Sequence, residues 1–512
     1  MIDLSLAPLL QRVLKDAGFS FDSVRRVLGA GPGGLVDLSS GPLAMHRTRG
    51  EGTLEVLVRL LVLGAGVSAE MVERALGREL TSAGLKGGLL ERSEGGEILS
   101  RLAGVPYGDM VVLADFSRRP LGPVEPARDH VMGIGRSTLV PTRLLEGAMK
   151  RQAGARLHTA LDLGCGCGFL ALWAGAWCDR VIGTDINPRA IELARFNALL
   201  NGRANVEIRQ GSLTEPVHGE TFDLIVSNPP FVISPESAIV YRDGAAQLSH
   251  VGVRRRGDEF CERVVRDASR LLGEGGVLVT TLNWSEIGDV NSGNWQGRLG
   301  GWAPEDCQAW VIRTDSQPVD AYAAMWIRHT MAGEPGWSEA RYFERFDAWM
   351  RHYEMLGVER IAYGQMIVRR KSPAFTMFED IDGRWIEGGA IDVVRALDGR
   401  ENAAGLREPA CWDDAAAWLA EKWKFASGTQ VQEVSEIGRA GSVAVCMAGR
   451  PVCGPMHTEL WRVLAGLTGR TSLGRTIEDG LAIGGIGGER KDEIAKLLWG
   501  LVREGALVRA AT

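Results

Sequence analysis

The chain has 512 residues, of which 45% are hydrophobic and 24% are charged, with 66 glycines against 20 prolines. This balance is typical of a folded globular protein and excludes a disordered or collagen-like chain. Lys and Arg number 58 and Asp and Glu number 64, giving a formal net charge of −6 at pH 7. An acidic chain is not expected to coat nucleic acid without sequence preference. At roughly 150 residues per domain, the length predicts about three domains.

The cysteines and the apolar runs indicate the cellular compartment of the protein. The 8 cysteines are scattered singly, which is typical of a reducing compartment and not of a disulfide-rich secreted domain. The first residues carry Asp3 and an amphipathic pattern where a signal peptide would need a basic start. The most apolar run after these first residues, Leu54 to Val67, is broken by Arg59 and is shorter than the ~20 residues that cross a bilayer. We therefore expect a cytoplasmic protein with no membrane partner.

Residues 1–126 have apolar residues at helical spacing, so we expect an N-terminal helical domain. Helices over 54–63, 68–76 and 80–90, followed by a polar hairpin at 93–96, resemble a winged helix. A helical lid or packing domain remains an alternative.

From residue 127 the pattern changes to short apolar strands that alternate with helices, which predicts a mostly parallel α/β sheet. This catalytic core is expected to span 127–371, with a helical insertion near 318–355. The expected strands are Thr159–Leu163, Arg180–Asp185, Val206–Gln210, Phe222–Ser227, Gly276–Asn283, Gln308–Thr314 and Arg360–Arg370. The expected helices are at about 169–178, 188–201, 258–272, 318–331 and 338–355.

Residues 372–512 form the third predicted domain. After irregular Gly- and Asp-rich turns, a helix is expected over Trp412–Lys424. The chain then ends in a winged-helix-like segment or a helical cap. Its expected elements are helices at His457–Leu467, Leu473–Leu481 and Glu489–Glu504 and a strand at Ala506–Arg509.

A glycine-rich loop follows the first core strand. Gly164, Gly166 and Gly168 alternate with cysteines and lead into a helix, so a ligand can approach bare backbone at the helix N-terminus. Dinucleotide enzymes place G-x-G-x-x-G here, but this loop has G-x-G-x-G and is preceded by Asp162. An anionic Asp162 would repel a pyrophosphate and suits the ammonium and sulfonium of S-adenosylmethionine. The loop therefore favours this cofactor.

The next two strands end in residues that suit the same cofactor. Asp185, followed by Ile186, lies about twenty residues after Gly164, where an acid accepts ribose hydroxyls. Capping the helix that begins near residue 188 is the alternative role for Asp185. Gly211 and Ser212 end the third strand, where a polar group meets the adenine amine. Two cysteines in the glycine loop lack a second pair of ligands, so we expect no metal.

The fourth strand delivers Asn228, Pro229, Pro230 and Phe231 at its carboxyl end, where open α/β sheets bind ligands. The prolines fix the backbone and remove two N–H donors. The Asn228 side-chain oxygen and the Pro229 carbonyl can then accept both hydrogens of one planar NH2 group and aim its nitrogen at the sulfonium methyl. Catalysis is then mainly orientation, with Phe231 as a stacking face. The alternative is a simple strand-terminating turn.

These motifs together resemble a known family. Three segments resemble class I S-adenosylmethionine-dependent methyltransferases of the NPPY/F type. They are LDLGCGCG at 161–168, AIELARFNALLNG at 190–202 and FDLIVSNPPFV at 222–232. These segments are most similar to the HemK/PrmC group of protein-glutamine methyltransferases. The resemblance covers about a quarter of the chain and implies a Rossmann-like domain with a seven-stranded, mostly parallel sheet.

The resemblance also implies roles for individual residues. A pre-core segment, His130–Arg143, would close over the methionine end of the cofactor through Thr142 and its neighbours Gly133, Thr138 and Pro141. Two residues depart from the family: Ser212 stands where an acid is usual, and Phe231 replaces a tyrosine. The expected cofactor-binding residues are Asp162, Gly164, Gly166, Gly168, Asp185, Ile186, Gly211, Ser212, Asn228 and Thr142. The expected catalytic residues are Asn228, Pro229, Pro230 and Phe231.

Three functions follow from this interpretation. The first is methylation of a glutamine side-chain amide in a protein, one of the translation apparatus by resemblance. The second is methylation of an exocyclic adenine or guanine amine in RNA or DNA, which Phe231, the arginines at 254–256 and the tryptophans 284, 295 and 302 would favour. The third is a non-catalytic scaffold that binds S-adenosylmethionine, which the intact tetrapeptide disfavours.

Overall fold

A computed structural model gives the structure of the chain. The chain folds into two compact units, the first comprising Met1–Pro141, Arg156–Glu305 and Val311–Lys371 and the second Thr142–Ala155, Asp306–Trp310 and Ser372–Thr512. The described residues are 2–29, 41–116, 129–151, 156–235, 257–287, 295–331, 338–381, 383, 386, 393–404, 413–415, 419–426, 429–436, 439–447, 450–451, 456–457, 464, 467–468, 470–484 and 490–510.

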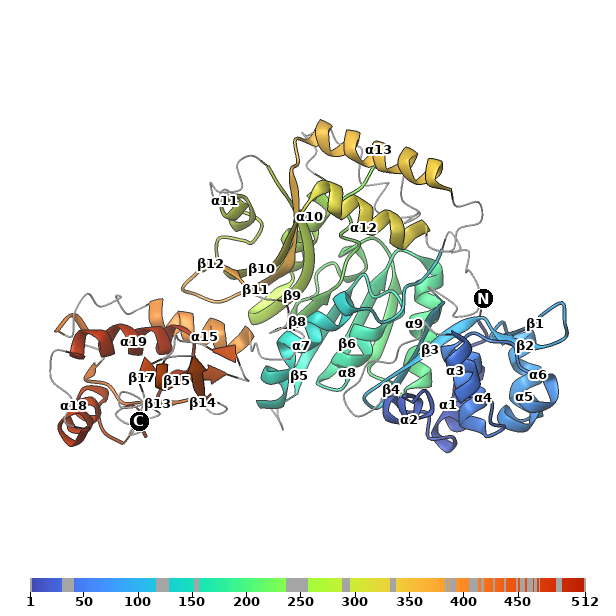
Figure 1. Cartoon of the computed structure of the whole chain (residues 1–512), viewed down its shortest axis with the longest axis horizontal. Coiled ribbons are helices and arrows are strands. Elements are labelled where there is room, and N and C mark those ends of the chain that lie inside the picture. Colours follow the sequence, from blue (N-terminus) through green and yellow to red (C-terminus); the bar gives the residue numbers. More distant parts are fainter. Residues whose placement is uncertain are drawn as a thin grey trace. The chain divides into compact units, whose positions relative to one another are not determined.

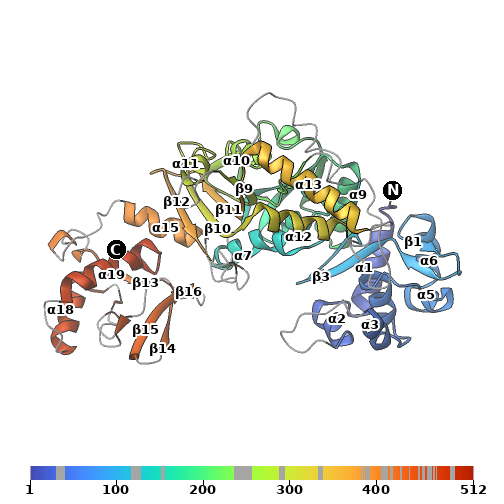
Figure 2. The same ribbon diagram turned by 45° about the horizontal axis from the view of Figure 1, so that its top comes forward.

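The first unit begins with a group of short helices (Figure 2). Serine side chains cap two of them, because Ser20 accepts from Ser23 N–H and Ser68 from Met71 N–H. A predicted hairpin follows, and an isolated bridge between Val67 and Ile98 extends it. The elements are α1 (Leu6–Asp16), α2 (Phe21–Val27), α3 (Gly41–Arg47), α4 (Thr53–Leu57), the π-helical turn η1 (Val58–Val62), α5 (Ala69–Leu76), α6 (Arg78–Lys86), β1 (Leu90–Arg92) and β2 (Ile98–Ser100).

A second hairpin, β3 (Leu102–Tyr107) and β4 (Met110–Asp115), corrects the expectation that this region is helical after its first hairpin. The strand β3 was not predicted because it contains Pro106, and a proline within an apolar run argues against a strand interior. In the structure Pro106 lies opposite Val111. The N–H and C=O of Val111 bond to a helix instead of to β3, so the missing N–H of Pro106 costs no ladder bond.

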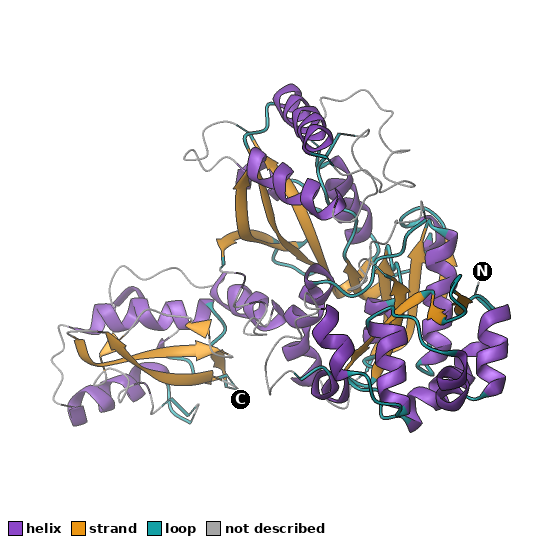
Figure 3. Ribbon diagram, turned by 45° about the vertical axis from the view of Figure 1, so that its right-hand side comes forward, coloured by secondary structure: helices purple, strands orange, loops and turns teal. Residues whose placement is uncertain are grey.

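The large sheet contains all seven predicted strands. Strands of this sheet are labelled in Figure 1, and strands are orange in Figure 3. Helices α8, α9 and α10 contact strands of the sheet. The elements are α7 (Arg136–Arg151), β5 (Leu157–Leu163), α8 (Phe169–Gly175), β6 (Cys178–Asp185), α9 (Pro188–Leu200), β7 (Val206–Gln210), η2 (Glu215–Val217), β8 (Phe222–Ser227), α10 (Glu259–Ser269), β9 (Leu272–Glu286), α11 (Trp295–Gly300), β10 (Gln308–Pro318), α12 (Val319–Met331), α13 (Glu339–Leu356) and β11 (Arg360–Arg369).

The strand order is β12-β10-β11-β9-β8-β5-β6-β7. The sheet therefore has eight strands rather than the expected seven. The added edge strand is β12 (Phe375–Asp380), whose residues belong to the second unit. Strands β7, β6, β5, β8 and β9 run parallel, and β11 pairs antiparallel with β9. This is the predicted Rossmann-like fold with a mixed sheet. Because β5, β6 and β8 are parallel neighbours, their carboxyl ends meet at one edge, where such sheets bind ligands.

The predicted helical insertion is the pair α12 and α13 between β10 and β11, and the two helices lie side by side (Figure 1). Ser338 caps α13 by accepting from Arg341 N–H. The pair has its own apolar core, which includes Trp349, Tyr353 and Ile233. Ile233 follows the predicted catalytic tetrapeptide, so the insertion packs on the chain leaving that site.

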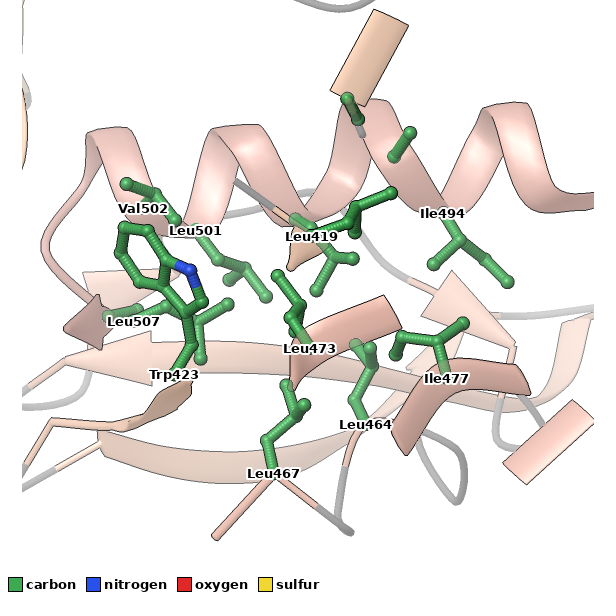
Figure 4. Packing of buried hydrophobic residues seen from close by; sticks show 14 of the residues in the cluster. Leu419, Trp423, Leu464, Leu467, Leu473, Ile477, Ile494, Leu501, Val502 and Leu507 are labelled. Atoms are coloured by element: carbon green, nitrogen blue, oxygen red, sulfur yellow. The ribbon is translucent and has the colours of Figure 1, made fainter. Parts of the chain in front are cut away.

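The second unit contains a separate apolar core, to which Trp423, Leu473 and Leu501 contribute (Figure 4). The predicted helices at 473–481 and 489–504 and the strand at 506–509 are present with shifts of a few residues. The elements are α15 (Val393–Ala404), η5 (Asp413–Ala415), β13 (Trp423–Phe425), β14 (Thr429–Glu436), β15 (Arg439–Met447), β16 (Arg450–Pro451), β17 (Met456–His457), α18 (Leu473–Gly484), α19 (Lys491–Arg503) and β18 (Leu507–Arg509).

Two predicted helices of this unit are wrong at their ends. Trp423 and Lys424, expected to end a helix, lie in β13, which pairs antiparallel with β18. His457, expected to begin a helix, lies in β17 and pairs with Ser442. Both errors arise from pairing with strands distant in the sequence, which a local apolar spacing does not report.

Candidate active site

The glycine loop lies between β5 and α8 at the carboxyl edge of the sheet. Gly164, Gly166 and Gly168 all have a left-handed backbone conformation, with φ of 75°, 52° and 83°. Residues that carry a Cβ rarely adopt this conformation. A Cβ added at Gly164 or Gly166 would meet no atom of the described chain within 4 Å, whereas one at Gly168 would lie 3.0 Å from the Ala194 Cβ. The first two glycines therefore leave open space for a ligand, and the third lets α9 approach the loop.

The loop is fixed by the end of the neighbouring strand β6. The N–H groups of Gly164 and Cys165 both donate to the Thr184 carbonyl, at 2.9 and 2.8 Å. Gly166 N–H donates to Asp185 Oδ2 at 2.9 Å. The predicted ribose acid thus also shapes the loop that it faces.

Asp185 keeps acceptor capacity after these contacts. Its Oδ1 accepts from Asn187 N–H at 2.9 Å, and each carboxylate oxygen has a second lone pair. Burial raises the pKa of Asp185, while bonds from Asn187 and Gly166 oppose the rise. The α9 cap predicted as its alternative role belongs to Asn187, whose side chain accepts from Arg189 N–H.

Asp162 is buried, with 1% of its surface exposed. Its Oδ2 accepts from Ala171 N–H at 2.8 Å in the first turn of α8. Its Oδ1 is buried and has no hydrogen-bond partner among the described residues. Burial raises the pKa of Asp162 to about 7, against a weaker opposing effect of the Ala171 bond. A buried acceptor lacking a partner beside an open glycine loop fits a cationic ligand group such as an ammonium.

The side expected to meet adenine is formed by the ends of β6 and β7. Ile186 exposes 38% of its surface and offers an apolar face. Gly211 N–H donates to the Asp185 carbonyl at 2.9 Å, which places the end of β7 beside Asp185. Ser212 follows and is half-buried. The structure therefore brings together Ile186, Gly211 and Ser212 next to the predicted ribose acid.

The tetrapeptide begins where β8 ends, one residue after Ser227, whose hydroxyl donates to the Leu163 carbonyl at 2.7 Å. The Asn228 amide donates to Thr138 Oγ1 at 3.2 Å and to Ser137 Oγ at 3.4 Å. Its Oδ1 is buried without a hydrogen-bond partner in the described part of the chain. The two hydroxyls therefore orient the amide so that its oxygen is left for another donor.

The pre-core segment contributes to this arrangement in part. Thr138 and Ser137 meet Asn228, although only Thr138 was singled out in the sequence. Thr142 lies buried inside α7, next to Pro141, and its role toward a cofactor stays a prediction. His130 is half-buried near Asp115, with Nδ1 3.8 Å from Asp115 Oδ2.

Phe231 contacts an aromatic residue that sequence reasoning missed. Its ring meets Tyr363 of β11 edge-on, with centroids 5.8 Å apart and planes at 63°. A tyrosine inside a buried strand gives no signal of such a contact. The contact links the tetrapeptide to β11.

Two further tyrosines, also missed, hold the residue that follows Val232. Ile233 N–H donates to the Tyr322 hydroxyl at 3.3 Å, and the Tyr353 hydroxyl donates to the Ile233 carbonyl at 2.8 Å. Asn283 of β9 donates to the same Tyr322 oxygen at 2.6 Å. The insertion helices therefore hold both sides of the Ile233 backbone.

The tryptophans expected to favour nucleic acid are buried. Trp284, Trp295 and Trp302 expose 0%, 9% and 2% of their surfaces. Trp284 stacks on Trp295 at 5.5 Å, and Arg298 lies over Trp302. They are core residues and offer no face to a base, which corrects that expectation. The arginines at 254–256 lie outside the described residues.

Neither a metal site nor a membrane span is found in the described part of the chain. Within it, no three His, Cys, Asp or Glu side chains are grouped to hold a metal ion. No described helix is both long and apolar enough to cross a bilayer.

Two protein families match the chain. Residues 140–242 match the family described as Methyltransferase small domain. Residues 16–100 match a family described as Domain of unknown function (DUF7059).

Curated relatives match part of the chain. The release factor glutamine methyltransferase of Aliivibrio fischeri is 35% identical over 172 residues, 30% of this chain and 56% of that protein. That of Salmonella typhimurium is 31% identical over 220 residues, 39% of this chain and 67% of that protein. The ribosomal protein uL3 glutamine methyltransferase of Xanthomonas campestris is 31% identical over 148 residues, 28% of this chain and 48% of that protein. This chain thus spans about half the length of the Aliivibrio and Xanthomonas proteins.

Proposed function

We propose that this chain, which belongs to the HemK/PrmC group of class I S-adenosylmethionine-dependent methyltransferases, methylates a glutamine side-chain amide in a protein of the translation apparatus. The observation that carries the proposal is the buried Asn228 Oδ1 at the end of β8, which lacks a partner among the described residues. An oxygen held in this way is suited to accept a hydrogen bond from an amide NH2. The relatives are named as glutamine methyltransferases of a release factor or of the ribosomal protein uL3. These names indicate a protein of the translation apparatus as the substrate class.

S-adenosylmethionine is the methyl donor of the family and supplies an electrophilic methyl group on a sulfonium. In the proposal, Asp185 accepts the ribose hydroxyls through its remaining lone pairs. Asp162 Oδ1 accepts from the ammonium, and the glycine loop accommodates the cofactor against its backbone. Ile186, Gly211 and Ser212 face the adenine, and Thr142 and Gly168 complete the predicted set.

The chain's own residues would act on the acceptor mainly by orienting it. Asn228 Oδ1 and the Pro229 carbonyl accept the two hydrogens of the glutamine amide, and Pro230 fixes the turn. Phe231 covers the flat amide group. Held through both hydrogens, the nitrogen would present its out-of-plane electron density toward the methyl group. Its electron pair would form the new N–C bond while the C–S electron pair returns to sulfur, and one N–H proton would pass to solvent water as or after the nitrogen becomes cationic. Orientation of this kind removes entropic cost from the barrier.

The flanking regions belong to the proposal as well. We interpret residues 1–126 and 372–512 as domains with winged-helix-like segments around a catalytic domain at 127–371. In the first, α5, α6 and the β1–β2 hairpin follow the winged-helix order. This segment carries both charge signs, with Arg74 paired to Glu51 and Glu70, so we propose that it meets a protein surface. We place the protein in the cytoplasm with the translation apparatus.

The test uses the full chain and cofactor labelled in its methyl group. Purified release factor, uL3 and total RNA from a strain lacking this gene are incubated separately with enzyme and label. We expect label in a protein, on a glutamine located by mass spectrometry, and its loss after protease treatment. Label that resists protease and disappears with nuclease would overturn the glutamine assignment. Bound cofactor with no transfer to any acceptor would indicate a scaffold.

A further inference from the structure

Helix α9 presents two asparagines, one turn apart, to strand β4. Asn197 accepts from Leu113 N–H at 2.9 Å and donates to Leu113 C=O at 2.8 Å. Asn201 does the same with Val111, at 2.8 Å for both bonds. Four residues of helix rise about 6 Å and two residues of strand about 6.6 Å. The spacings match, so the two side chains act as a partner for the edge of β4 that faces away from β3.

The two asparagines differ in their third hydrogen bond. Asn197 donates its second amide hydrogen to the Cys167 carbonyl at 2.8 Å. Asn201 donates its second hydrogen to the Asn197 carbonyl within its own helix, also at 2.8 Å. Asn197 is fully buried, with 0% of its surface exposed. The side-chain amide of Asn197 therefore bonds both to the β3–β4 hairpin and to the glycine loop.

Cys167 lies between Gly166 and Gly168, the two loop glycines nearest α8. The opposite side of the loop is held by β6, through Thr184 and Asp185. The bond from Asn197 holds the side nearest α8. A planar amide with both hydrogens in use has no freedom to rotate without breaking one of its bonds.

We infer that Asn197 is a positioning residue that fixes the glycine loop in its cofactor-binding shape, and that it does so only while the hairpin at residues 102–115 is docked on α9. The inference rests on the proposed use of this loop as the cofactor site. It gives the hairpin a role in binding S-adenosylmethionine although the hairpin precedes the methyltransferase motifs. A second contact supports the docking, because Arg189 at the other end of α9 pairs with Asp115 at the end of β4.

The asparagine pair provides a matched experiment. N197D and N201D each keep the oxygen that accepts from β4 and each lose two N–H donors. N197D is expected to lower the melting temperature more than N201D, because Asn197 is fully buried and Asn201 is half-buried. Only N197D is expected to weaken S-adenosylmethionine binding, at least tenfold by calorimetry at a temperature where both variants are folded, with N201D within twofold of the wild type. If N197D does not fold, N197S and N201S serve for the same comparison.

A measurement without cofactor separates this inference from the proposed function. Hydrogen exchange of the peptide covering 164–168 should speed up at least tenfold in the N197 variant and stay unchanged in the N201 variant. Equal effects of the two variants on affinity and exchange would overturn the inference and leave a purely structural pair. If the wild type bound no cofactor, the proposed function would fail, and exchange would still decide whether Asn197 holds the loop.

Discussion

The Tyr353 hydroxyl of α13 donates a hydrogen bond to the Ile233 carbonyl at 2.8 Å. These residues are 120 positions apart in the sequence, and Ile233 is only two residues beyond Phe231. Tyr353 is fully buried, so its hydroxyl is held away from water. The bond connects the helical insertion to the backbone that carries the proposed acceptor site.

Replacing Tyr353 with Phe should therefore affect turnover more than cofactor binding. The change leaves the ring in place and removes one donor, which we expect to cost about 1–3 kcal/mol of stability because the Ile233 carbonyl stays buried. We expect kcat for methyl transfer to fall roughly tenfold, equivalent to about 1.4 kcal/mol in the barrier. Affinity for S-adenosylmethionine should be unchanged by calorimetry.

The matched control is Tyr342→Phe on the same helix, where the ring stacks on Phe346 with centroids 6.1 Å apart. This variant should retain the wild-type kcat. An unchanged kcat in Tyr353→Phe would mean that the insertion does not position the tetrapeptide.

Asn228→Ala should abolish methyl transfer and leave cofactor affinity within about twofold of the wild type. The residue acts on the acceptor nitrogen in the proposal, and losing an orienting group removes a large part of the catalytic advantage. Initial rates with labelled cofactor measure the effect. Thr138→Val removes the hydroxyl that accepts from Asn228 Nδ2 and should cause a smaller loss, because the side chain itself remains. Turnover of Asn228→Ala within a factor of about three of the wild type would rule out the orientation mechanism.

Asp185→Ala should weaken S-adenosylmethionine binding at least tenfold. The change removes two proposed ribose bonds to a charged group, each worth about 1.5–3 kcal/mol, and also the bond that holds Gly166 N–H. Asp185→Asn keeps one oxygen acceptor and should lie between the wild type and the alanine variant. Undiminished affinity in Asp185→Ala would remove this residue from the cofactor site.

Cofactor affinity should rise as pH increases from about 6 to about 8. Burial raises the pKa of Asp162 to about 7, so its carboxyl is mostly protonated at pH 6 and mostly ionised at pH 8. The ionised form is the one that attracts an ammonium. Asp162→Asn titrates no proton there, so its affinity should lose the part of the pH dependence that this carboxyl causes. Parallel pH profiles of the two proteins would contradict the proposed contact.

The same shift has a consequence for stability without cofactor. The folded pKa of Asp162 lies above the unfolded value of 3.8, so the folded state binds the proton more tightly. The free energy of unfolding should then fall as pH rises from about 4 to about 7, by at most about 1.4 kcal/mol per pH unit from this group. Denaturant titrations of wild type and Asp162→Asn measure it. The difference between the two proteins should level off above pH 7.

The sequence predicted the sheet well because its strands are short, apolar and separated by helices. The strands Val206–Gln210 and Phe222–Ser227 match the structure at both ends. The glycine loop, Asp185 and Asn228 could be placed at one edge because parallel strands end there. These are local patterns combined with one topological rule.

The parts that were missed depend on partners far away in the sequence. β3 contains Gly104 and Pro106, which argue against a strand. It forms by pairing with β4, whose other edge bonds to Asn197 and Asn201 of α9. Tyr322 and Tyr353 lie on helices whose apolar spacing predicts burial and says nothing of the Ile233 backbone. The buried tryptophans show the converse error, because aromatic residues near a site in sequence need not face it.

The loop from Asn228 to Ile233 is anchored at both ends, at one end by Ser137 and Thr138 and at the other by Tyr322 and Tyr353. Fixing one residue's backbone costs about 1–2 kcal/mol of conformational entropy. In this chain that ordering occurs when the protein folds, not when the acceptor arrives. In the proposed reaction, a glutamine side chain then loses mainly its own freedom on binding, so acceptors should be discriminated by how readily each can extend a glutamine from its surface.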